Sequence, residues 1–324
     1  MNWPPFRPHR LLHSGHLQTV AGAWWRLSGR HLHGTVQHVV SLTDGDRLVL
    51  HDDCPSHWQT GDRTALLVHG LAGCHASRYM IRIARTLTAN GVRTFRLDLR
   101  GCGAGRGLAR LPYHAGRWPD VEAAARFITA NCTGSELSVA GFSLGGNIIL
   151  RWLGESTDFT QENVRRAIAI NPPVDLACST ENIATVARGA YDRHFARLLY
   201  RQVRGSSQWN DESPLATSGR RPTRLIEFDE LFTAPLSGFE NAQHYYASAS
   251  AGPVIPQIRV PTLILSAADD PLIPHAMLTA LKRPASVLLH LERHGGHLGY
   301  IARQGIDPDR HWMDWRVVDW LSGE

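Results

Sequence analysis

The chain has 324 residues, of which 43% are hydrophobic and 19% are charged, so it carries enough apolar material for a large core and is not a disordered chain. Its 34 basic and 29 acidic side chains give a formal net charge of +5. The basic residues are scattered rather than clustered, which argues against a nucleic-acid partner. Because α/β architectures often exceed about 250 residues as one unit, we expect a single domain over residues 1–324.

No stretch approaches the roughly 20 consecutive apolar residues of a membrane-spanning helix, and the start of the chain has no continuous apolar signal region. We therefore expect a cytoplasmic protein. The cysteines are odd in number and never fall in CxxC spacing, and the 18 histidines form no HExxH pair, so we expect neither a disulfide framework nor a metal site. The five cysteines are Cys54, Cys74, Cys102, Cys132 and Cys178.

Residues 36–42 and 47–52 read as a β-hairpin, because the turn Thr43-Asp44-Gly45-Asp46 places glycine where a positive φ is needed. These would be antiparallel edge strands. Further along, short apolar runs alternate with helical patterns, which is typical of a mainly parallel sheet with helices on both faces. The expected buried strands are residues 64–69, 92–98, 137–140, 167–170, 262–266 and 287–291. The expected helices are residues 78–90, 119–131, 145–153, 275–281 and 310–321.

One segment interrupts this alternation. From about residue 176 to residue 250 the chain is helix-like and contains no strong strand candidate. Because it is inserted within the series of strands, we interpret it as a lid over a substrate pocket, with a packing insertion as the alternative.

The motif Gly141-Phe142-Ser143-Leu144-Gly145 is a G-x-S-x-G pentapeptide. It follows the strand-like residues 137–140 directly and precedes a helix start, which is the setting that a nucleophilic serine on a sharp turn requires. Such a turn brings backbone segments close together, so only small residues fit at positions 141 and 145. A tight structural turn with a passive serine is the alternative.

A serine hydroxyl needs a base that removes its proton and a third group that orients the base. In this fold type the acid and then the histidine follow the serine in chain order. Residues 262–266 lead into Asp269-Asp270, and Asp270 is our choice of acid, whereas Asp269 is expected to shape the turn. After the next strand, His297 is our choice of base, because Gly295-Gly296 allows it to lean over the sheet. We expect His294 to be structural.

Negative charge that develops on a substrate oxygen needs hydrogen-bond donors. One expected donor is the backbone amide of Leu144, directly after the serine. The other is the amide of Leu71 in the Gly-rich turn His69-Gly70-Leu71-Ala72-Gly73, for which a plain strand-to-helix turn is the alternative.

Taken together, these residues resemble the α/β-hydrolase superfamily over nearly the whole chain, and several further segments resemble its YheT-like (ABHD1/ABHD3-related) hydrolase family. Those segments are Ser14-Gly15-His16-Leu17-Gln18-Thr19, His69-Gly70-Leu71-Ala72-Gly73, Arg100-Gly101-Cys102-Gly103, Tyr113-His114-Ala115-Gly116, Phe228-Asp229-Glu230-Leu231-Phe232-Thr233-Ala234-Pro235 and Asp269-Asp270-Pro271. The resemblance implies a mostly parallel eight-stranded sheet with a helical lid insertion. It also implies that Ser143, Asp270 and His297 form a catalytic triad that acts on carboxylic esters without a cofactor.

The chain departs from the family pattern at a few positions. Ala72 stands where the family carries Glu, Cys74 and His75 stand where it carries small serines, and Asp98 stands where it carries Asn. These changes leave the backbone donors intact. Asp98 is either a local cap or a pocket residue.

We therefore expect a serine carboxylesterase for small-molecule ester substrates, with short- to medium-chain acyl or lipid esters as candidates. An alcohol acyltransferase that uses the same acyl-enzyme is one alternative, and ester formation in added ethanol would distinguish it. A binding module without catalysis is another, and failure of a fluorophosphonate probe to label Ser143 would favour it. Weak membrane-surface contact through Trp3, Phe6, Trp24 and Trp25 is a further possibility, with packing of these rings against the core as the preferred alternative.

Overall fold

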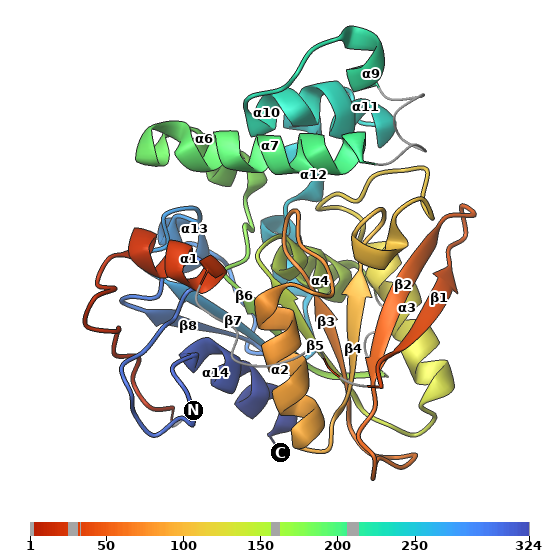
Figure 1. The fold of residues 1–324 in the computed structure, drawn as a ribbon, viewed down its shortest axis with the longest axis vertical. Helices are drawn as coiled ribbons and strands as arrows, with labels where there is room; N and C mark the ends of the chain where they lie inside the picture. Colours follow the sequence, from red (N-terminus) through yellow and green to blue (C-terminus); the bar gives the residue numbers. More distant parts are fainter. Residues whose placement is uncertain (1–2, 25–31, 33, 157–162, 206–213, 324) are drawn as a thin grey trace.

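The computed structural model describes residues 3–24, 32, 34–156, 163–205 and 214–323. Its centre is an eight-stranded sheet in the order β1-β2-β4-β3-β5-β6-β7-β8 (Figure 1). The strands are β1 (Val36–Ser41), β2 (Arg47–Asp53), β3 (Thr64–Val68), β4 (Arg93–Asp98), β5 (Leu137–Phe142), β6 (Val164–Ile170), β7 (Thr262–Ala267) and β8 (Val287–Glu292). The strands expected from the sequence are all present, with bounds that differ by up to three residues.

The expected hairpin is also present, with one correction to its place in the sheet. β1 pairs with β2 in antiparallel register and forms the edge, but β2 is an inner strand that also pairs antiparallel with β4. Every other pair is parallel. The carboxyl ends of these parallel strands therefore meet along one edge of the sheet, where open α/β sheets bind their ligands.

Helices cover both faces of the sheet because the strand side chains alternate between them. Leu66 and Val68 of β3 pack in the cluster that includes α3 (Trp118–Asn131) and α4 (Leu144–Glu155). Ala65 and Leu67 of the same strand pack in the cluster that includes α2 (Arg78–Ala89) and α14 (Trp312–Ser322). With both faces covered, the central strands β3 and β7 are buried along their whole length.

The segment between β6 and β7 is helical, and no strand occurs in its described residues. Its helices lie above the sheet in Figure 1, separated from the helices that flank the two faces. We refer to residues 176–250 as the cap. Its elements are α6 (Leu176–Thr185), η2 (Val186–Gly189), α7 (Ala190–Arg204), α9 (Pro214–Ser218), α10 (Leu225–Phe228), the π-helical turn η3 (Asp229–Thr233), α11 (Ala234–Leu236) and α12 (Ala242–Ala249). The remaining elements are α1 (Gly15–Trp24), η1 (Gly103–Gly105), η4 (Gly252–Gln257) and α13 (His275–Thr279).

The N-terminal aromatic residues that the sequence suggested for membrane contact have partners inside the molecule. Phe6 is buried and packs edge-on against Tyr300 and Trp312, and Trp3 packs edge-on against Trp312. Trp25 and the side chain of Trp24 lie outside the described residues. Within the described ranges, we find no helix with the length and apolar character needed to cross a membrane.

Candidate active site

Ser143 occupies the sharp turn between β5 and α4. Its backbone has φ 51° and ψ −120°, a conformation that L-residues rarely adopt and that surrounding structure must enforce. The two glycines of the motif allow the turn. A Cβ on Gly141 would lie 2.4 Å from the carbonyl oxygen of Gly145, and a Cβ on Gly145 would lie 2.4 Å from that of Val68. These contacts confirm the prediction from the sequence that only small residues fit at positions 141 and 145.

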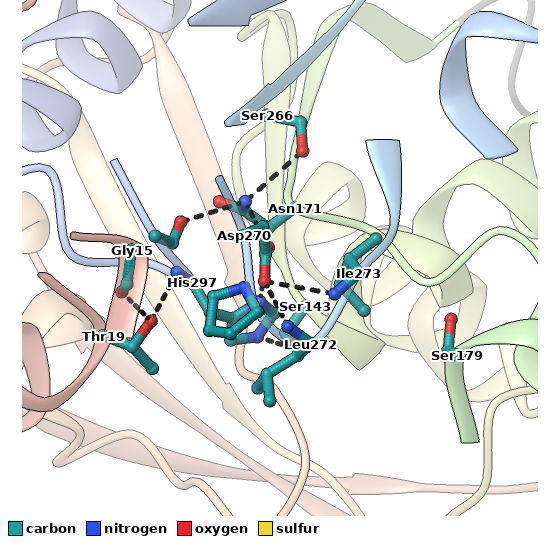
Figure 2. A network of polar contacts seen from close by, with 12 residues as sticks. Gly15, Thr19, Ser143, Asn171, Ser179, Ser266, Asp270, Leu272, Ile273 and His297 are labelled. Carbon is teal, nitrogen blue, oxygen red and sulfur yellow. Dashed lines mark hydrogen bonds and ion pairs between the residues drawn. The ribbon is translucent and has the colours of Figure 1, made fainter. Parts of the chain in front are cut away.

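The histidine loop after β8 and the acid loop after β7 meet at Ser143. His297 Nε2 lies 2.9 Å from Ser143 Oγ, and His297 Nδ1 lies 2.8 Å from Asp270 Oδ2 (Figure 2). The side chains of Asp270 and His297 are largely buried, which excludes water from their contact. Three residues that are far apart in the sequence thus form one hydrogen-bonded chain at the carboxyl edge of the sheet.

Asp270 is held in a fixed orientation by four donors. Its Oδ1 accepts hydrogen bonds from the backbone amides of Leu272 and Ile273, at 2.8 and 3.1 Å. Its Oδ2 accepts from Asn171 Nδ2 at 2.7 Å as well as from His297. Because the ring nitrogen Nδ1 faces a carboxylate, His297 carries a proton there and presents Nε2 to the serine as an acceptor.

Asp269 and His294, the competing candidates in the sequence, are paired with each other. Asp269 Oδ2 lies 3.2 Å from His294 Nδ1, and Asp269 Oδ1 accepts a hydrogen bond from the amide of Gly296. Within the part of the chain that the structure describes, neither residue forms a hydrogen bond with Ser143. This second acid and histidine pair shapes the loop that carries His297.

The two expected amide donors flank Ser143 and are left free by their neighbours. In the turn after β3, the amide of Gly70 donates to the hydroxyl of Tyr79, and the amide of Ala72 donates to the hydroxyl of Tyr113. The amide of Leu71 between them has no acceptor among the described residues, and neither has the amide of Leu144 at the first position of α4. Burial raises the pKa of Tyr79 to about 12, so this hydroxyl stays neutral and keeps its contact with the loop.

The site is supported by three further residues, Thr19, Gln18 and Asn171. The sequence alone did not assign this role to any of them. Thr19 Oγ1 in α1 accepts a hydrogen bond from the amide of His297 at 2.9 Å (Figure 2). Gln18 donates to and accepts from the backbone of Ile301. Asn171 follows β6 with φ 46° and donates to Asp270. A signal for the first two was available, because both belong to the Ser14-to-Thr19 segment on which the family resemblance rests. For Asn171, the signal is an amide residue directly after a buried strand.

A cavity of about 80 Å³ opens onto Ser143 and His297. The sheet side contributes Leu71 and Leu144, and the remaining wall comes mostly from the cap. The apolar cap residues in this wall are Leu176, Ile183, Phe195, Leu199 and Leu225. The arrangement fits an acyl group in the apolar part of the cavity, with its carbonyl next to the serine.

One group of potential metal ligands occurs among the described residues, formed by His51, His75 and Asp98. His51 Nε2 and His75 Nδ1 both lie within hydrogen-bond distance of Asp98 Oδ2, at 2.9 and 2.7 Å. The two rings stack 3.5 Å apart at 14°, so no point near both nitrogens lies in both ring planes, as shared coordination of one cation would require. The geometry therefore fits hydrogen bonds rather than metal coordination.

The sequence left open whether Asp98 is a local cap or a pocket residue, and the structure distinguishes the two. Its side chain is fully buried and does not line the cavity beside Ser143. Burial acts to raise its pKa, but hydrogen bonds from His51 and His75 outweigh this and hold the pKa of Asp98 below its usual value. Because it also accepts from the amides of His75 and Ala104, Asp98 is a local cap that ties the loop after β3 to the end of β4.

Known proteins resemble this chain in sequence over most of its length. A putative esterase YheT of Escherichia coli is 29% identical, over 98% of this chain and 93% of the relative. The human monoacylglycerol lipase ABHD2 is 26% identical, over 95% of this chain and 77% of the relative. A monoacylglycerol lipase of Saccharomyces cerevisiae is 28% identical, over 72% of this chain and 54% of the relative.

Solved structures and a family model agree on the fold. The esterase Pf2001 of Pyrococcus furiosus superimposes with a TM-score of 0.57 at 13% identity, covering 99% of this chain and 98% of that one. The family model described as alpha/beta hydrolase fold matches residues 65–304, which contain the serine, acid and histidine loops. The chain therefore belongs to the alpha/beta hydrolase fold family, and the resemblance drawn from its sequence is confirmed.

Proposed function

We propose that this chain is a serine carboxylesterase that hydrolyses esters through an acyl-enzyme on Ser143. Its family membership and its esterase and lipase relatives make it an enzyme that hydrolyses ester bonds. The observation that carries the finer assignment is the continuous chain of hydrogen bonds from Asp270 through His297 to Ser143.

In the proposed mechanism, Ser143 Oγ attacks the ester carbonyl while His297 Nε2 takes the serine proton. Asp270 fixes the tautomer of the ring and stabilises the positive charge that forms on it. His297 then gives the proton to the leaving alcohol, whose oxygen departs from the carbonyl carbon. Water then attacks the carbonyl carbon of the acyl-enzyme while His297 Nε2 takes one of its protons, the bond between that carbon and Ser143 Oγ breaks, and His297 returns the proton to Ser143 Oγ as the carboxylic acid leaves.

The oxyanion of each tetrahedral intermediate would be bound by the amides of Leu71 and Leu144. Their freedom from other acceptors supports this role, because a donor already paired in the resting enzyme has to break a contact before it can act. Removal of one such donor in other hydrolases costs about 3 kcal/mol of barrier, so the pair would supply a large part of the catalysis.

The cap, residues 176–250, is proposed as a lid within a single domain spanning residues 1–324. Its apolar side chains form the wall opposite Ser143, so the acyl chain would lie between cap and sheet. The names of two relatives, both monoacylglycerol lipases, support lipid esters as substrates, and short- to medium-chain acyl esters are the other candidates. A cavity of about 80 Å³ is too small for a long acyl chain, so long substrates would need movement of the cap.

The first test is hydrolysis of p-nitrophenyl esters from acetate to palmitate by wild type and by Ser143→Ala. We expect wild-type turnover with an optimum at short or medium chain length and a loss of about 10⁴-fold or more in Ser143→Ala, with an unchanged circular dichroism spectrum. Activity that survives in the folded Ser143→Ala variant would contradict the assignment. Repeating the assay in ethanol separates hydrolysis from acyl transfer, since a transferase would accumulate the ethyl ester.

A further inference from the structure

Asp229 is an acidic residue in the wall of the substrate cavity with no role in the mechanism above. It is the first residue of the π-helical turn in the cap and lines the cavity of about 80 Å³ together with Ser143 and His297. It also lines a second, adjoining cavity of about 30 Å³, which shares Leu71 and Leu144 with the first. Asp229, which is half-buried, therefore borders the space in which an ester bound to Ser143 would lie.

The contacts of this carboxylate come from neutral hydroxyl groups. Thr233 Oγ1 donates to Asp229 Oδ1, and the Tyr246 hydroxyl donates to Asp229 Oδ2, each at 2.7 Å. Among the described residues, Asp229 forms no ion pair with a lysine, arginine or histidine. Each oxygen keeps one further acceptor position, so the site has spare capacity for a donor that arrives with the substrate.

A carboxylate in such surroundings reduces the stability of the free enzyme. Burial raises the pKa of Asp229 to about 6, more than its two hydroxyl partners lower it, and the neighbouring Asp192 raises it further. At neutral pH the group is still mainly ionised, because the pH lies above this pKa. An asparagine of the same volume would accept one of these hydroxyl groups without the burial of a charge, so support of the π-helical turn alone does not account for a carboxylate here.

We propose that Asp229 accepts a hydrogen bond from a free hydroxyl group of the ester substrate, so that the enzyme selects hydroxylated esters over their deoxy counterparts. This inference rests on the proposed esterase function and deepens it by naming a chemical feature of the substrate. Asp229 is then a specificity-determining residue, while Ser143, His297 and Asp270 carry out the reaction.

The size of the available space favours a hydroxyl over a cationic head group. The adjoining cavity of about 30 Å³ has room for one or two groups the size of a water molecule. A hydroxyl fits this space, whereas a trimethylammonium group would have to approach Asp229 from the larger cavity beside Ser143, so octanoylcholine is included among the test substrates. The hydroxyl can belong to the alcohol part of the ester, as in a partial ester of a polyol, or to the acyl part, as in a hydroxy-acid ester.

The test compares matched ester pairs in wild type and variants. The alcohol-side pair is 1-octanoylglycerol and propyl octanoate, and the acyl-side pair is methyl 8-hydroxyoctanoate and methyl octanoate. The measured quantity is the ratio of kcat/KM between the hydroxylated ester and its deoxy partner, because this ratio in a variant relative to wild type cancels intrinsic differences between the esters. Asp229→Asn keeps the volume and removes the charge, and Asp229→Val removes both acceptor oxygens.

Two controls separate recognition from support of the fold. Thr233→Val removes one partner of Asp229 but leaves the carboxylate, so it should change both members of a pair by similar factors. Glu240→Gln removes a carboxylate that is exposed on the cap, and both ratios should stay at their wild-type values. Octanoylcholine is a fifth substrate that tests for a cationic head group.

We expect the ratio of at least one pair to fall about tenfold in Asp229→Asn, with the deoxy ester hydrolysed within about threefold of its wild-type rate, because hydrogen bonds to charged groups are stronger than those to neutral groups. The pair that responds locates the hydroxyl on the alcohol or the acyl side. Ratios that stay within about threefold of wild type in folded Asp229→Asn would overturn the proposal, as would a loss confined to octanoylcholine. A wild-type enzyme that cleaves none of the five esters would refute the esterase function itself and the subsite with it.

Discussion

The sheet side and the cap side of the cavity are built in different ways. On the sheet side, Ser143, Asp270 and His297 lie on loops that leave parallel strands, and Asp270 alone accepts four hydrogen bonds. On the cap side, helices that include α6 and α7 present apolar and polar side chains, and Asp229 is a half-buried acid whose carboxylate accepts hydrogen bonds from two hydroxyl groups among the described residues. The rigid side is suited to bond breaking, which needs groups fixed to within a fraction of an ångström, and the cap side to substrate selection.

The largest expected effect separates two adjacent acids on the sheet side. Asp270→Asn should lower kcat about 10⁴-fold, because an amide beside His297 Nδ1 no longer holds the reactive tautomer. Asp269→Asn is the matched control and should stay within about tenfold of wild type, since Asp269 faces His294 and the amide of Gly296. Steady-state kinetics with p-nitrophenyl butyrate measures both, and equal losses would contradict our choice of acid.

Alanine substitutions at two glycines test how tightly the sheet side and the cap are packed. Gly145→Ala should lower the free energy of unfolding by about 3 kcal/mol, because the new Cβ would lie 2.4 and 2.5 Å from the carbonyl oxygens of Val68 and His69. Gly238→Ala in the cap meets no atom within 4 Å, so only its positive φ of 77° is strained, at about 1 kcal/mol. Urea denaturation measures both values, and a cap variant that loses as much as the core variant would show that the cap is packed as tightly.

The cap also carries a predicted pH dependence. The folded-state pKa of Asp229 is about 6, above its ordinary value of 3.8, so folding is penalised progressively as the pH rises from about 4 to above 6. Asp229→Asn removes this penalty and should therefore be more stable than wild type at pH 7.5, with the advantage lost at pH 4. Thermal unfolding of both proteins across this range tests the sign, and a variant that is less stable than wild type at pH 7.5 would refute it.

The smallest expected effect concerns support of the histidine loop from α1. Thr19→Val removes the acceptor of the His297 amide hydrogen bond and should lower kcat about fivefold with little change in KM, because the ring becomes less well oriented. Val20→Ala is a control in the same helix, since the Val20 side chain is exposed and its truncation leaves Thr19 in place, and we expect its kcat to match wild type. Similar kcat values for Thr19→Val and wild type would show that the loop keeps its position without α1.

Features of the fold and site that have local sequence signals were predictable, whereas contacts between distant residues were not. The strands and the serine turn were predictable because their signals are local: apolar runs of strand length and the glycines at 141 and 145, whose replacement would clash with backbone. The contacts of Thr19 with His297 and of Asn171 with Asp270 were not, since they join residues 278 and 99 positions apart. The inner position of β2 depends on pairing with β4, which no pattern within the hairpin specifies. The π-helical turn that begins at Asp229, a residue lining the cavity, likewise has no local signature, although the family resemblance includes its residues.

The most direct test of the central claim is covalent labelling of the purified protein with a fluorophosphonate, followed by peptide mass spectrometry. We predict that one serine, Ser143, is labelled, because Ser143 Oγ is hydrogen-bonded to His297 Nε2 and Ser143 lines the cavity between sheet and cap. We also predict that Asp270→Asn is labelled far more slowly, and that Asp269→Asn is labelled at close to the wild-type rate. Absence of label on Ser143, or label on another serine that persists in Ser143→Ala, would contradict this claim.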